Sequence, residues 1–418
     1  MRRWTKPALA SLLAGVAACH RPSGAPTPTG GEPELRVGIV VGAPRVLLGG
    51  EGGGELFITD DGNGQPVGSI PAGATWTVVA DSGRLRLLRP DGTATEPHGG
   101  VAAVNVTEGR FVIANGRRYR GRLHVDAGPR GLTLVNRVEM EGYLAGVIAP
   151  EIGARRAEEM AAVLAQAVVS RSFAFRNRGR WESLGFDAYA DVRDQVYVGV
   201  GAETAQAWDA VRRTAGQVLR YRGVVIDAFF HSTCGFSTAG VEEAFGTSSS
   251  RPYLRPVSDA RGGGHYYCDL SPRFRWREEW DGGKLRAILS RTLPAVAPAT
   301  GGGAGLQRIT DVEVTRLTRS GRVGELRIVF DRGDARVPGP EVRNVLRPES
   351  DRTLSSAAFQ LAVTKDAGQV SRVVASGAGS GHGVGMCQWG AVGRARAGQN
   401  YRRILATYFP GTTLDRIY

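Results

Sequence analysis

Short segments with alternating hydrophobic and polar positions dominate the first third of the chain. Glycine-rich turns such as DDGNG and PDG separate them. Successive side chains of a strand point to opposite faces of a sheet, so a period of two predicts strands with one buried face. The segments are LRVGIVV, ELFIT, TWTVVA, RLRLLRP, RFVIA and GLTLVNRV. We therefore predict antiparallel β structure over residues 35–138.

The period of the pattern changes after this region. Over residues 156–176 the apolar side chains recur at intervals of three and four, which predicts a helix with a wide buried face. Pro150 and Gly153 predict a turn just before it rather than a helix start. Further helices are predicted over residues 203–215 and 284–293. The middle of the chain is thus partly helical.

Strands resume in the second half of the chain. Residues 309–330 alternate again and predict a hairpin that turns at Ser320 and Gly321. A glycine-rich loop follows at 377–385, and a short helix is predicted over residues 388–397. The predicted fold class is α+β, mostly β, with antiparallel strands and a few helices flanking a groove.

The first 18 residues have the pattern of an export signal. A short cationic stretch precedes an apolar run that is too short to remain as a membrane-spanning helix. The run ends in small residues directly before Cys19, as in a bacterial lipobox, where the cysteine is acylated and becomes the new N-terminus. A simple secretory signal cleaved near Ala18 is the alternative. We favour lipidation of Cys19, which would give a stable membrane anchor.

The rest of the chain is expected to form a tether and one large folded region. Residues 19–34 are rich in Pro and Gly and predict a flexible tether. Residues 35–418 are long enough for a sizeable core, with an N-terminal β part at 35–138 and a second part at 139–418. The second part contains a loop insertion near 295–306. No later stretch approaches 18 unbroken apolar residues, so no transmembrane helix is expected.

The net charge of the chain indicates which kind of molecule it binds. The net charge is +13, or +10 once the three bases of the signal are removed (13 − 3), and nearly all the bases are arginine. A basic protein outside the cytoplasm favours anionic polymers of the cell envelope. The export signal argues against nucleic acid, and no finger or helix-turn-helix pattern is present.

Two features could carry acid–base chemistry or ligand binding. Glu151 lies between Pro150 and Ile152, beside the start of the predicted helix, where a partly apolar setting would suit proton donation. The loop GSGHGVGMCQWG carries His382 among four alternating glycines, which let a backbone approach a ligand closely. On spacing alone, a solvated Glu151 and a tight turn with a structural His382 are the simpler interpretations.

The cysteines allow two interpretations. His231-x-x-Cys234 and His265-x-x-Cys268 form matched pairs that could hold a tetrahedral zinc ion. In an exported protein, Cys234 and Cys268 could equally form a disulfide, which we favour. Cys387 would then be left free and buried.

The order and wording of these motifs resemble the SpoIID/LytB (stage II sporulation protein D) family. The resemblance runs over nearly all of the chain after the tether. It is carried by YRG (119–121), LVN (134–136), EGYLAGVIAPE (141–151), AQAVVSRSF (165–173), DQVYVG (194–199), TAG (214–216), HSTCG (231–235), SPRFRW (271–276) and GHGVGMCQWGA (381–391).

The resemblance implies lytic transglycosylation of peptidoglycan, best on glycan strands stripped of their peptides. Glu151 matches the family's essential glutamate, although Ile152 and Gly153 replace the usual Met and Pro after it. One carboxyl suffices, as general acid and then base, because the muramyl 6-hydroxyl closes on C1 to give a 1,6-anhydro ring. Substrate-binding positions are expected at His382, Gln195, Tyr197, Arg171 and Gln388, although Arg171 could instead be structural.

Partners and cofactors follow from the same resemblance. The runner-up function is a non-catalytic glycan-binding module that stimulates a cell-wall amidase; a zinc amidase is a weaker third. No cofactor is required, and a structural zinc is the lesser alternative to the disulfide. Some members bind zinc with a different His and Cys spacing, so that metal is not carried over. We expect an exported lipoprotein on the periplasmic side, at the outer membrane if the cell is Gram-negative.

Overall fold

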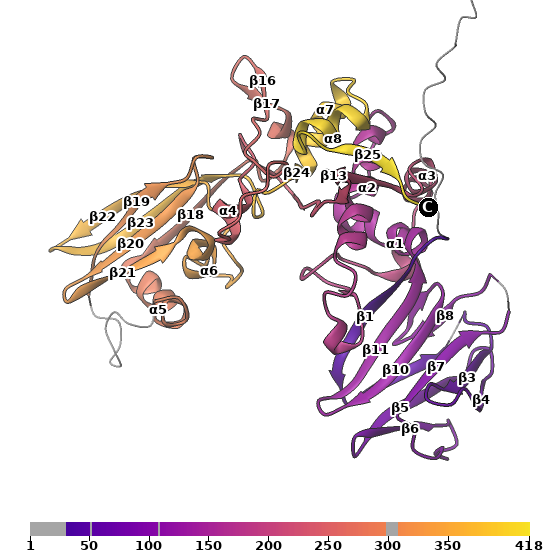
Figure 1. Ribbon diagram of the computed structural model, residues 1–418. Helices are drawn as coiled ribbons and strands as arrows, with labels where there is room; N and C mark the ends of the chain where they lie inside the picture. The colour runs from indigo at the N-terminus through magenta and orange to yellow at the C-terminus, as the bar shows by residue number, and fades with distance from the viewer. Residues whose placement is uncertain (1–30, 51, 108, 298–307) are drawn as a thin grey trace, which may run out of the picture.

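The computed structural model describes residues 31–50, 52–107, 109–297 and 308–418. The predicted signal peptide (1–18), the lipidation site Cys19 and most of the predicted tether therefore lie outside the described residues. The described chain forms an N-terminal β region, a helical middle and a second β module. The helical middle lies between the two β regions (Figure 1). Within the described residues, no helix is both long and apolar enough for a membrane crossing.

Two sheets make up the N-terminal region, and they are antiparallel apart from the short parallel pair β1–β12. One has the order β12 (Ala188–Tyr189), β1 (Glu34–Ala43), β11 (Gly131–Glu139), β10 (Arg122–Gly128), β7 (Gly100–Asn105), β3 (Leu56–Asp60), β4 (Pro66–Ile70). The other has the order β6 (Arg84–Leu88), β5 (Thr75–Asp81), β2 (Arg45–Gly49), β8 (Val112–Ala114), β9 (Arg117–Tyr119).

The alternation in the sequence matches the burial in these strands. In β6, Leu85 and Leu87 are buried, while Arg84 is exposed and Arg86 is half-buried. Burial of one face against the other sheet is what stabilises each short strand. The antiparallel β structure predicted over residues 35–138 is confirmed.

Helix α2 (Met160–Arg176) is the centre of the middle region. Residues 162–174 of α2 are all buried. The helix packs against other helices and against a small sheet, so every side of it is covered. Its neighbours are α1 (Met140–Ile152), α3 (Ala205–Arg213), α7 (Gln388–Arg396), α8 (Tyr401–Tyr408) and β13 (Gln217–Tyr221), which pairs with β14 (Val224–Val225) and β25 (Thr413–Arg416).

Helix α1 corrects the prediction for residues 149–153. Those residues are the last turn of α1, not a turn that introduces the next helix. Pro150 cannot bond to the carbonyl four residues earlier because it has no N–H. The carbonyl of Gly146 instead accepts the N–H of Val198 at 3.5 Å. Gly153, at φ +74°, ends the helix. Because of the proline, the Gly146 carbonyl is available to hold the segment around residue 198 against the end of α1.

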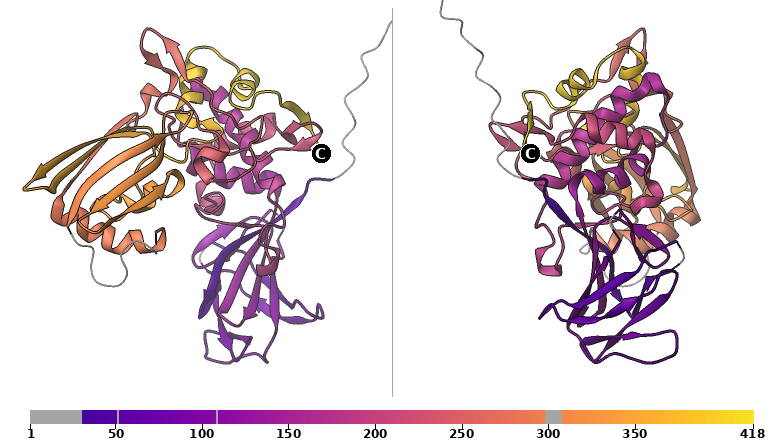
Figure 2. Two further views of the ribbon diagram at one scale, coloured as in Figure 1. Left: turned by 60° about the vertical axis from the view of Figure 1, so that its left-hand side comes forward. Right: turned by 90° about the vertical axis from the view of Figure 1, so that its right-hand side faces the viewer.

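The second β module has a hydrophobic core of its own. Trp280, Leu326 and Val373 lie in this core, which is separate from the core shared by the first two regions. Figure 2 shows the module standing beside the helices. It consists of the sheets β18 (Arg275–Asp281), β23 (Gln369–Ala378), β22 (Phe359–Asp366) and β19 (Ile309–Leu317), β20 (Val323–Phe330), β21 (Gly333–Pro338), with α5 (Gly282–Thr292) and α6 (Val342–Val345).

Several predictions for the second half hold. The hairpin over 309–330 turns at Ser320 and Gly321, as predicted. The helices predicted at 203–215, 284–293 and 388–397 are α3, α5 and α7. The fold class, α+β with several antiparallel sheets, is confirmed.

Candidate active site

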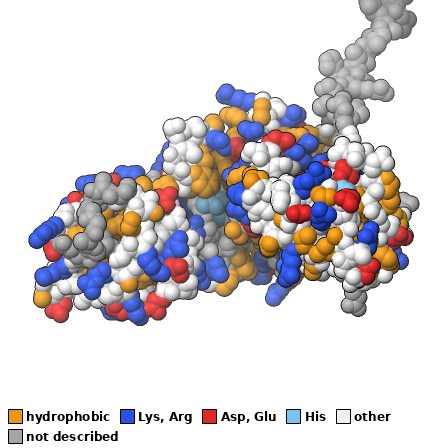
Figure 3. Space-filling model, turned by 90° about the horizontal axis from the view of Figure 1, so that it is seen from below, with side chains coloured by type: hydrophobic (Ala, Val, Ile, Leu, Met, Phe, Trp, Pro, Cys, Tyr) orange, Lys and Arg blue, Asp and Glu red, His pale blue; other side chains and the backbone are white. Residues whose placement is uncertain are grey.

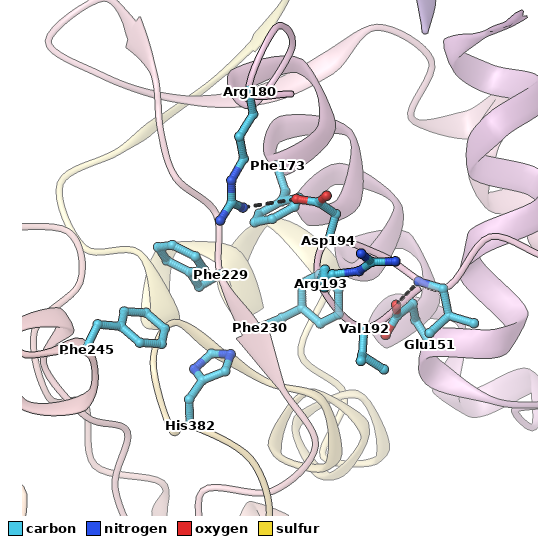
Figure 4. Close-up of a pocket in the computed structure, with 11 residues that line it drawn as sticks. Glu151, Phe173, Arg180, Val192, Arg193, Asp194, Phe229, Phe230, Phe245 and His382 are labelled. Atoms are coloured by element: carbon cyan, nitrogen blue, oxygen red, sulfur yellow. Dashed lines mark hydrogen bonds and ion pairs between the residues drawn. The ribbon is translucent and has the colours of Figure 1, made fainter. Parts of the chain in front are cut away.

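A cavity of about 380 Å³ lies where the helical middle meets the chain segments before and after the second β module. Figure 4 shows its lining, which brings together chain segments far apart in the sequence. The lining residues are Glu151, Phe173, Arg180, Val192, Arg193, Asp194, Val196, Phe229, Phe230, Phe245 and His382. Glu151 and His382, two of the residues expected from the sequence, therefore line the same cavity.

Glu151 is half-buried in the last turn of α1. Its Oε1 accepts the N–H of Val196 at 2.9 Å, and its main-chain carbonyl accepts Nε2 of Gln388 at 3.0 Å. Burial raises the pKa of the Glu151 carboxyl, and the single hydrogen bond from Val196 opposes this only in part. The position at a helix C-terminus, where the dipole is negative, also disfavours a carboxylate. Both effects favour a proton donor.

Asp194 is the other carboxyl in the lining, and it is fully engaged. Its oxygens accept Arg180 Nη1 at 3.0 Å, Trp181 Nε1 at 2.7 Å and the N–H of Tyr189 at 2.9 Å. Its side chain is only 1% exposed. Asp194 therefore holds the cavity wall together rather than facing a substrate.

The arginines of the lining are also engaged. Arg180 pairs with Asp194, and Arg193 pairs with Asp191. Among the described residues, no cation forms an ion pair with Glu151. The cavity thus contains one carboxyl that is free to exchange a proton.

His382 lies in an aromatic wall. Its ring centroid is 5.2 Å from that of Phe245 and 6.1 Å from that of Phe229. Nδ1 accepts the N–H of Val384 at 3.0 Å. Burial lowers the pKa of His382 to about 3. The ring is therefore neutral, and because Nδ1 is an acceptor the proton is on Nε2. His382 can donate a hydrogen bond but is a poor acid.

The glycines of the loop around His382 serve packing against protein. Gly385 has φ +72°, and a Cβ there would lie 2.0 Å from the carbonyl oxygen of Phe229. At Gly383, a Cβ would meet the guanidinium of Arg322. The loop therefore lies directly on the segment that follows β14, and this contact brings His382 beside Phe229.

Gln195 and Tyr197 lie beneath the cavity instead of lining it. Both are buried. The Tyr143 hydroxyl donates to Gln195 Oε1 at 3.1 Å, and the Tyr197 hydroxyl donates to Asn136 Oδ1 at 2.8 Å. They flank Val196, whose N–H holds Glu151. Their contacts support the segment that positions the carboxyl.

Arg171 lies away from the cavity. It is fully buried and pairs with Glu141 through Nε at 2.9 Å and through Nη2 at 2.5 Å. It also donates to the carbonyl of Gln217 at 3.1 Å. These contacts fasten α2 to the start of α1 and to β13. The structural alternative, not substrate binding, is what this geometry supports.

Gln388 supports Glu151 from below. It begins α7, directly after Cys387, and its Nε2 donates to both the Glu151 carbonyl and Gln166 Oε1. It does not line the cavity. Gln388 therefore joins α7, α1 and α2 at the point where the carboxyl sits.

The cysteines differ from the favoured interpretation. Cys234 Sγ and Cys268 Sγ lie 3.5 Å apart and are not bonded, since a disulfide requires about 2.05 Å. The zinc set with both histidines is not assembled either. His265 is exposed and bonds Asp269, while Nδ1 of His231 bonds the Val384 carbonyl.

The sequence did not reveal the aromatic part of the cavity. Phe229 and Phe230 lie at the short strand β15 (Phe230–His231), and Phe245 lies in the short helix α4 (Val241–Phe245). No spacing rule links these residues to Glu151, because the contact is made by tertiary packing. Only the Phe-Phe pair directly before His231 was a local signal.

Comparison with known proteins places the chain. Residues 129–221 match the family model described as SpoIID, stage II sporulation protein, and residues 264–385 match a domain of unknown function, DUF8618. Two proteins of Bacillus subtilis are each 25% identical over 76% of this chain: stage II sporulation protein D, over 88% of its length, and an amidase enhancer, over half of its length. An uncharacterized protein of Brachyspira hyodysenteriae is 29% identical over 74% of this chain and 75% of its own.

The protein is therefore an α+β protein whose cavity holds one carboxyl without an ion pair, that of Glu151, at the end of helix α1. The SpoIID match includes this helix and the segment that holds the carboxyl, residues 140–152 and 194–198. Residues 129–221 thus carry a SpoIID domain, and the chain is similar to stage II sporulation protein D and to the amidase enhancer over about three quarters of its length. The second β module lies within the DUF8618 match.

Proposed function

We propose that this protein is a lytic transglycosylase that cleaves the MurNAc–GlcNAc bond of peptidoglycan glycan strands, best when these are stripped of peptides. The observation that carries the proposal concerns the two carboxyls of the cavity. Asp194 is held in an ion pair with Arg180, whereas Glu151 accepts one main-chain N–H and has no ion pair among the described residues. Hydrolytic glycosidases usually need two working carboxylates. A lytic transglycosylase needs one, because the substrate supplies its own nucleophile.

The first half of the reaction is proton donation. Protonated Glu151 gives its proton to the glycosidic oxygen, and the bond from C1 of MurNAc to that oxygen breaks. The N-acetylglucosamine side leaves with a hydroxyl, and an oxocarbenium-like state forms at C1. The raised pKa of Glu151 keeps the acid protonated to a higher pH than an ordinary glutamate.

The second half returns the proton. The Glu151 carboxylate removes the proton of the MurNAc 6-hydroxyl, and that oxygen bonds to C1 to form the 1,6-anhydro ring. The atoms balance without water, and Glu151 ends protonated again. The Val196 N–H stabilises the carboxylate between the two halves. The wall of Phe229, Phe245 and His382 offers flat surfaces to the sugar rings.

The setting of this activity is also part of the proposal. An exported chain anchored by a lipid at Cys19 would act on the periplasmic side, at the outer membrane in a Gram-negative cell. The charge of +10 without the signal (13 − 3) suits an anionic wall polymer.

A second function is a non-catalytic one, in which the chain holds glycan and stimulates a cell-wall amidase. It is favoured by the relative named amidase enhancer and by Ile152 and Gly153, which depart from the family pattern after Glu151. In this case the cavity would bind a strand without cleaving it.

The variant Glu151→Gln separates these functions. It keeps the side-chain size and removes the proton, so we expect at least a hundredfold loss of 1,6-anhydro products from purified, peptide-free strands, measured by mass spectrometry. Glu158→Gln, at an exposed carboxyl, is the matched control and should cleave at the wild-type rate. Wild-type cleavage by Glu151→Gln would exclude the transglycosylase; unchanged stimulation of an amidase by it would favour the second function.

A further inference from the structure

Three cysteines and an aspartate converge beside the cavity. Cys234, Asp259, Cys268 and Cys387 are all fully buried, and one ligand atom from each lies within 4.8 Å of every other. Cys234 Sγ is 3.5 Å from Cys268 Sγ and 3.6 Å from Asp259 Oδ2. The four come from separate stretches of the chain, and none lies in the catalytic cavity.

The spacing of these atoms fits a metal ion at their centre. Zinc bound by thiolates has Zn–S distances of about 2.3 Å in a tetrahedron, which puts the ligand atoms about 3.8 Å apart. A disulfide would require one pair at about 2.05 Å and would leave the third sulfur unpaired. Three sulfurs and one carboxylate oxygen, with no fifth donor needed, form a closed tetrahedral set.

The surroundings of one of the three sulfurs, that of Cys387, favour a thiolate. Cys387 Sγ accepts the N–H of Cys234 and that of Gly390, both at 3.2 Å, and it caps the N-terminus of α7. Hydrogen bonds of this kind and a helix N-terminus stabilise a negative sulfur. A neutral thiol would gain little from either.

Two buried guanidinium groups complete the charge balance. Arg394 and the Tyr408 hydroxyl donate to Asp259 Oδ1, at 3.2 and 2.7 Å. Arg322 is 4% exposed and donates to the Cys234 carbonyl at 3.2 Å. No carboxylate of the described chain forms an ion pair with Arg322. A buried unpaired cation is costly, and an anionic metal–thiolate cluster next to it would offset that cost.

We propose that Cys234, Asp259, Cys268 and Cys387 bind one structural zinc ion that clamps the second β module to the helical core. Cys268 precedes the first strand of the module, β18, and Cys387 follows its last strand, β23. The ion would therefore fasten both ends of the module at one point. Cys387 also adjoins Gln388, which holds the end of α1, so the clamp would position the cavity as well.

The test is the metal content of the whole protein, with Cys19→Ser to remove the fourth thiol. We expect about one zinc per chain by plasma mass spectrometry after purification without added metal. Blocking the thiols under native conditions should release that zinc as three thiols react. Cobalt(II) in its place should give the intense visible absorption of a tetrahedral site and a thiolate charge-transfer band.

Variants assign the ligands. Asp259→Asn and Cys387→Ser should each lose zinc to a competing chelator at least tenfold more readily. His265→Ala, at an exposed residue outside the cluster, should retain zinc like the parent. Less than about 0.1 metal per chain, a Cys234–Cys268 disulfide in the non-reduced protein, or zinc loss in His265→Ala would each overturn the proposal. The cobalt spectrum of the parent protein decides the matter if a variant does not fold.

Discussion

Glu151 lies where a carboxyl keeps its proton to a higher pH than the usual value of about 4.5. The causes are burial, first, and a helix C-terminus, while one N–H from Val196 opposes them. In the proposed reaction the protonated form is the active one. The value of kcat/KM should therefore stay level at low pH and fall as pH rises through the raised pKa. A rate profile that falls from about pH 4.5 would show that the environment has no effect on the acid.

The same shift predicts a stability change. A carboxyl whose pKa is higher in the folded than in the unfolded state contributes stability below its unfolded pKa, and this is lost as pH rises through the folded pKa. Glu151→Gln should therefore raise the melting temperature at pH 7, by about 1–3 °C, and not at pH 4. Thermal unfolding at the two pH values checks this. Glu158→Gln should change neither; a lower melting temperature for Glu151→Gln at pH 7 would contradict the account.

Arg171 gives a prediction of the opposite kind. Its buried pair with Glu141 joins α2 to α1, away from the cavity. Arg171→Met should cost about 3–5 kcal/mol of unfolding free energy, because Glu141 loses its ion pair and keeps only the hydrogen bonds from Gly216 and Tyr418. Denaturant unfolding measures the loss. Cleavage per folded molecule should remain near wild type, and a loss of kcat with unchanged stability would place Arg171 at the substrate after all.

At the scale of elements, the sequence predicts what depends on local pattern. The alternation at residues 84–88 and the turn at Ser320 are local signals, and both elements form. Helix α1 is missed because it is buried on nearly every side and contains Pro150, so it has neither a polar face nor an ordinary end. The bond from the Val198 N–H to the Gly146 carbonyl, which Pro150 leaves without a helical donor, is a tertiary contact.

In the candidate site, too, the residues that belong to motifs could be predicted from the sequence, whereas those brought together by tertiary packing could not. Glu151 and His382 were identified by motif and do line one cavity. The cysteine cluster could not be found from spacing, because its four residues stand at irregular intervals and Asp259 belongs to no motif. Of the residues in the matched H-x-x-C pairs, the structure brings Cys234 and Cys268 into the cluster and leaves His231 and His265 outside it. His265 is on the surface, away from the buried cluster.

In the loop of residues 379–385, one added methyl group is expected to affect both stability and the position of His382. In Gly385→Ala, the Cβ would lie 2.0 Å from the Phe229 carbonyl oxygen at a positive φ. We expect a loss of about 2–4 kcal/mol and displacement of His382. Gly398→Ala, also at positive φ but with open space around it, is the control and should cost about 1 kcal/mol. Equal losses in denaturant unfolding would show that strain, not contact, governs the loop.

At the scale of the molecule, the cavity lies at the junction between the helical middle and the second β module. Figure 3 shows two lobes, with hydrophobic side chains gathered where they meet and basic side chains spread over both. The helical core supplies Glu151, and the Gly-rich loop that returns from the second β module supplies His382. The proposed zinc clamp lies at the same junction. A strand of glycan would be held between parts whose relative position the clamp fixes.

The central claim is that one carboxyl suffices because water is not the nucleophile. The most direct measurement is cleavage of purified, peptide-free glycan strands in water labelled with oxygen-18, followed by mass spectrometry of the new MurNAc ends. The account predicts ends that carry no label and are lighter than hydrolysed ends by one water. Label in the new ends, or no cleavage by the wild-type protein, would contradict it.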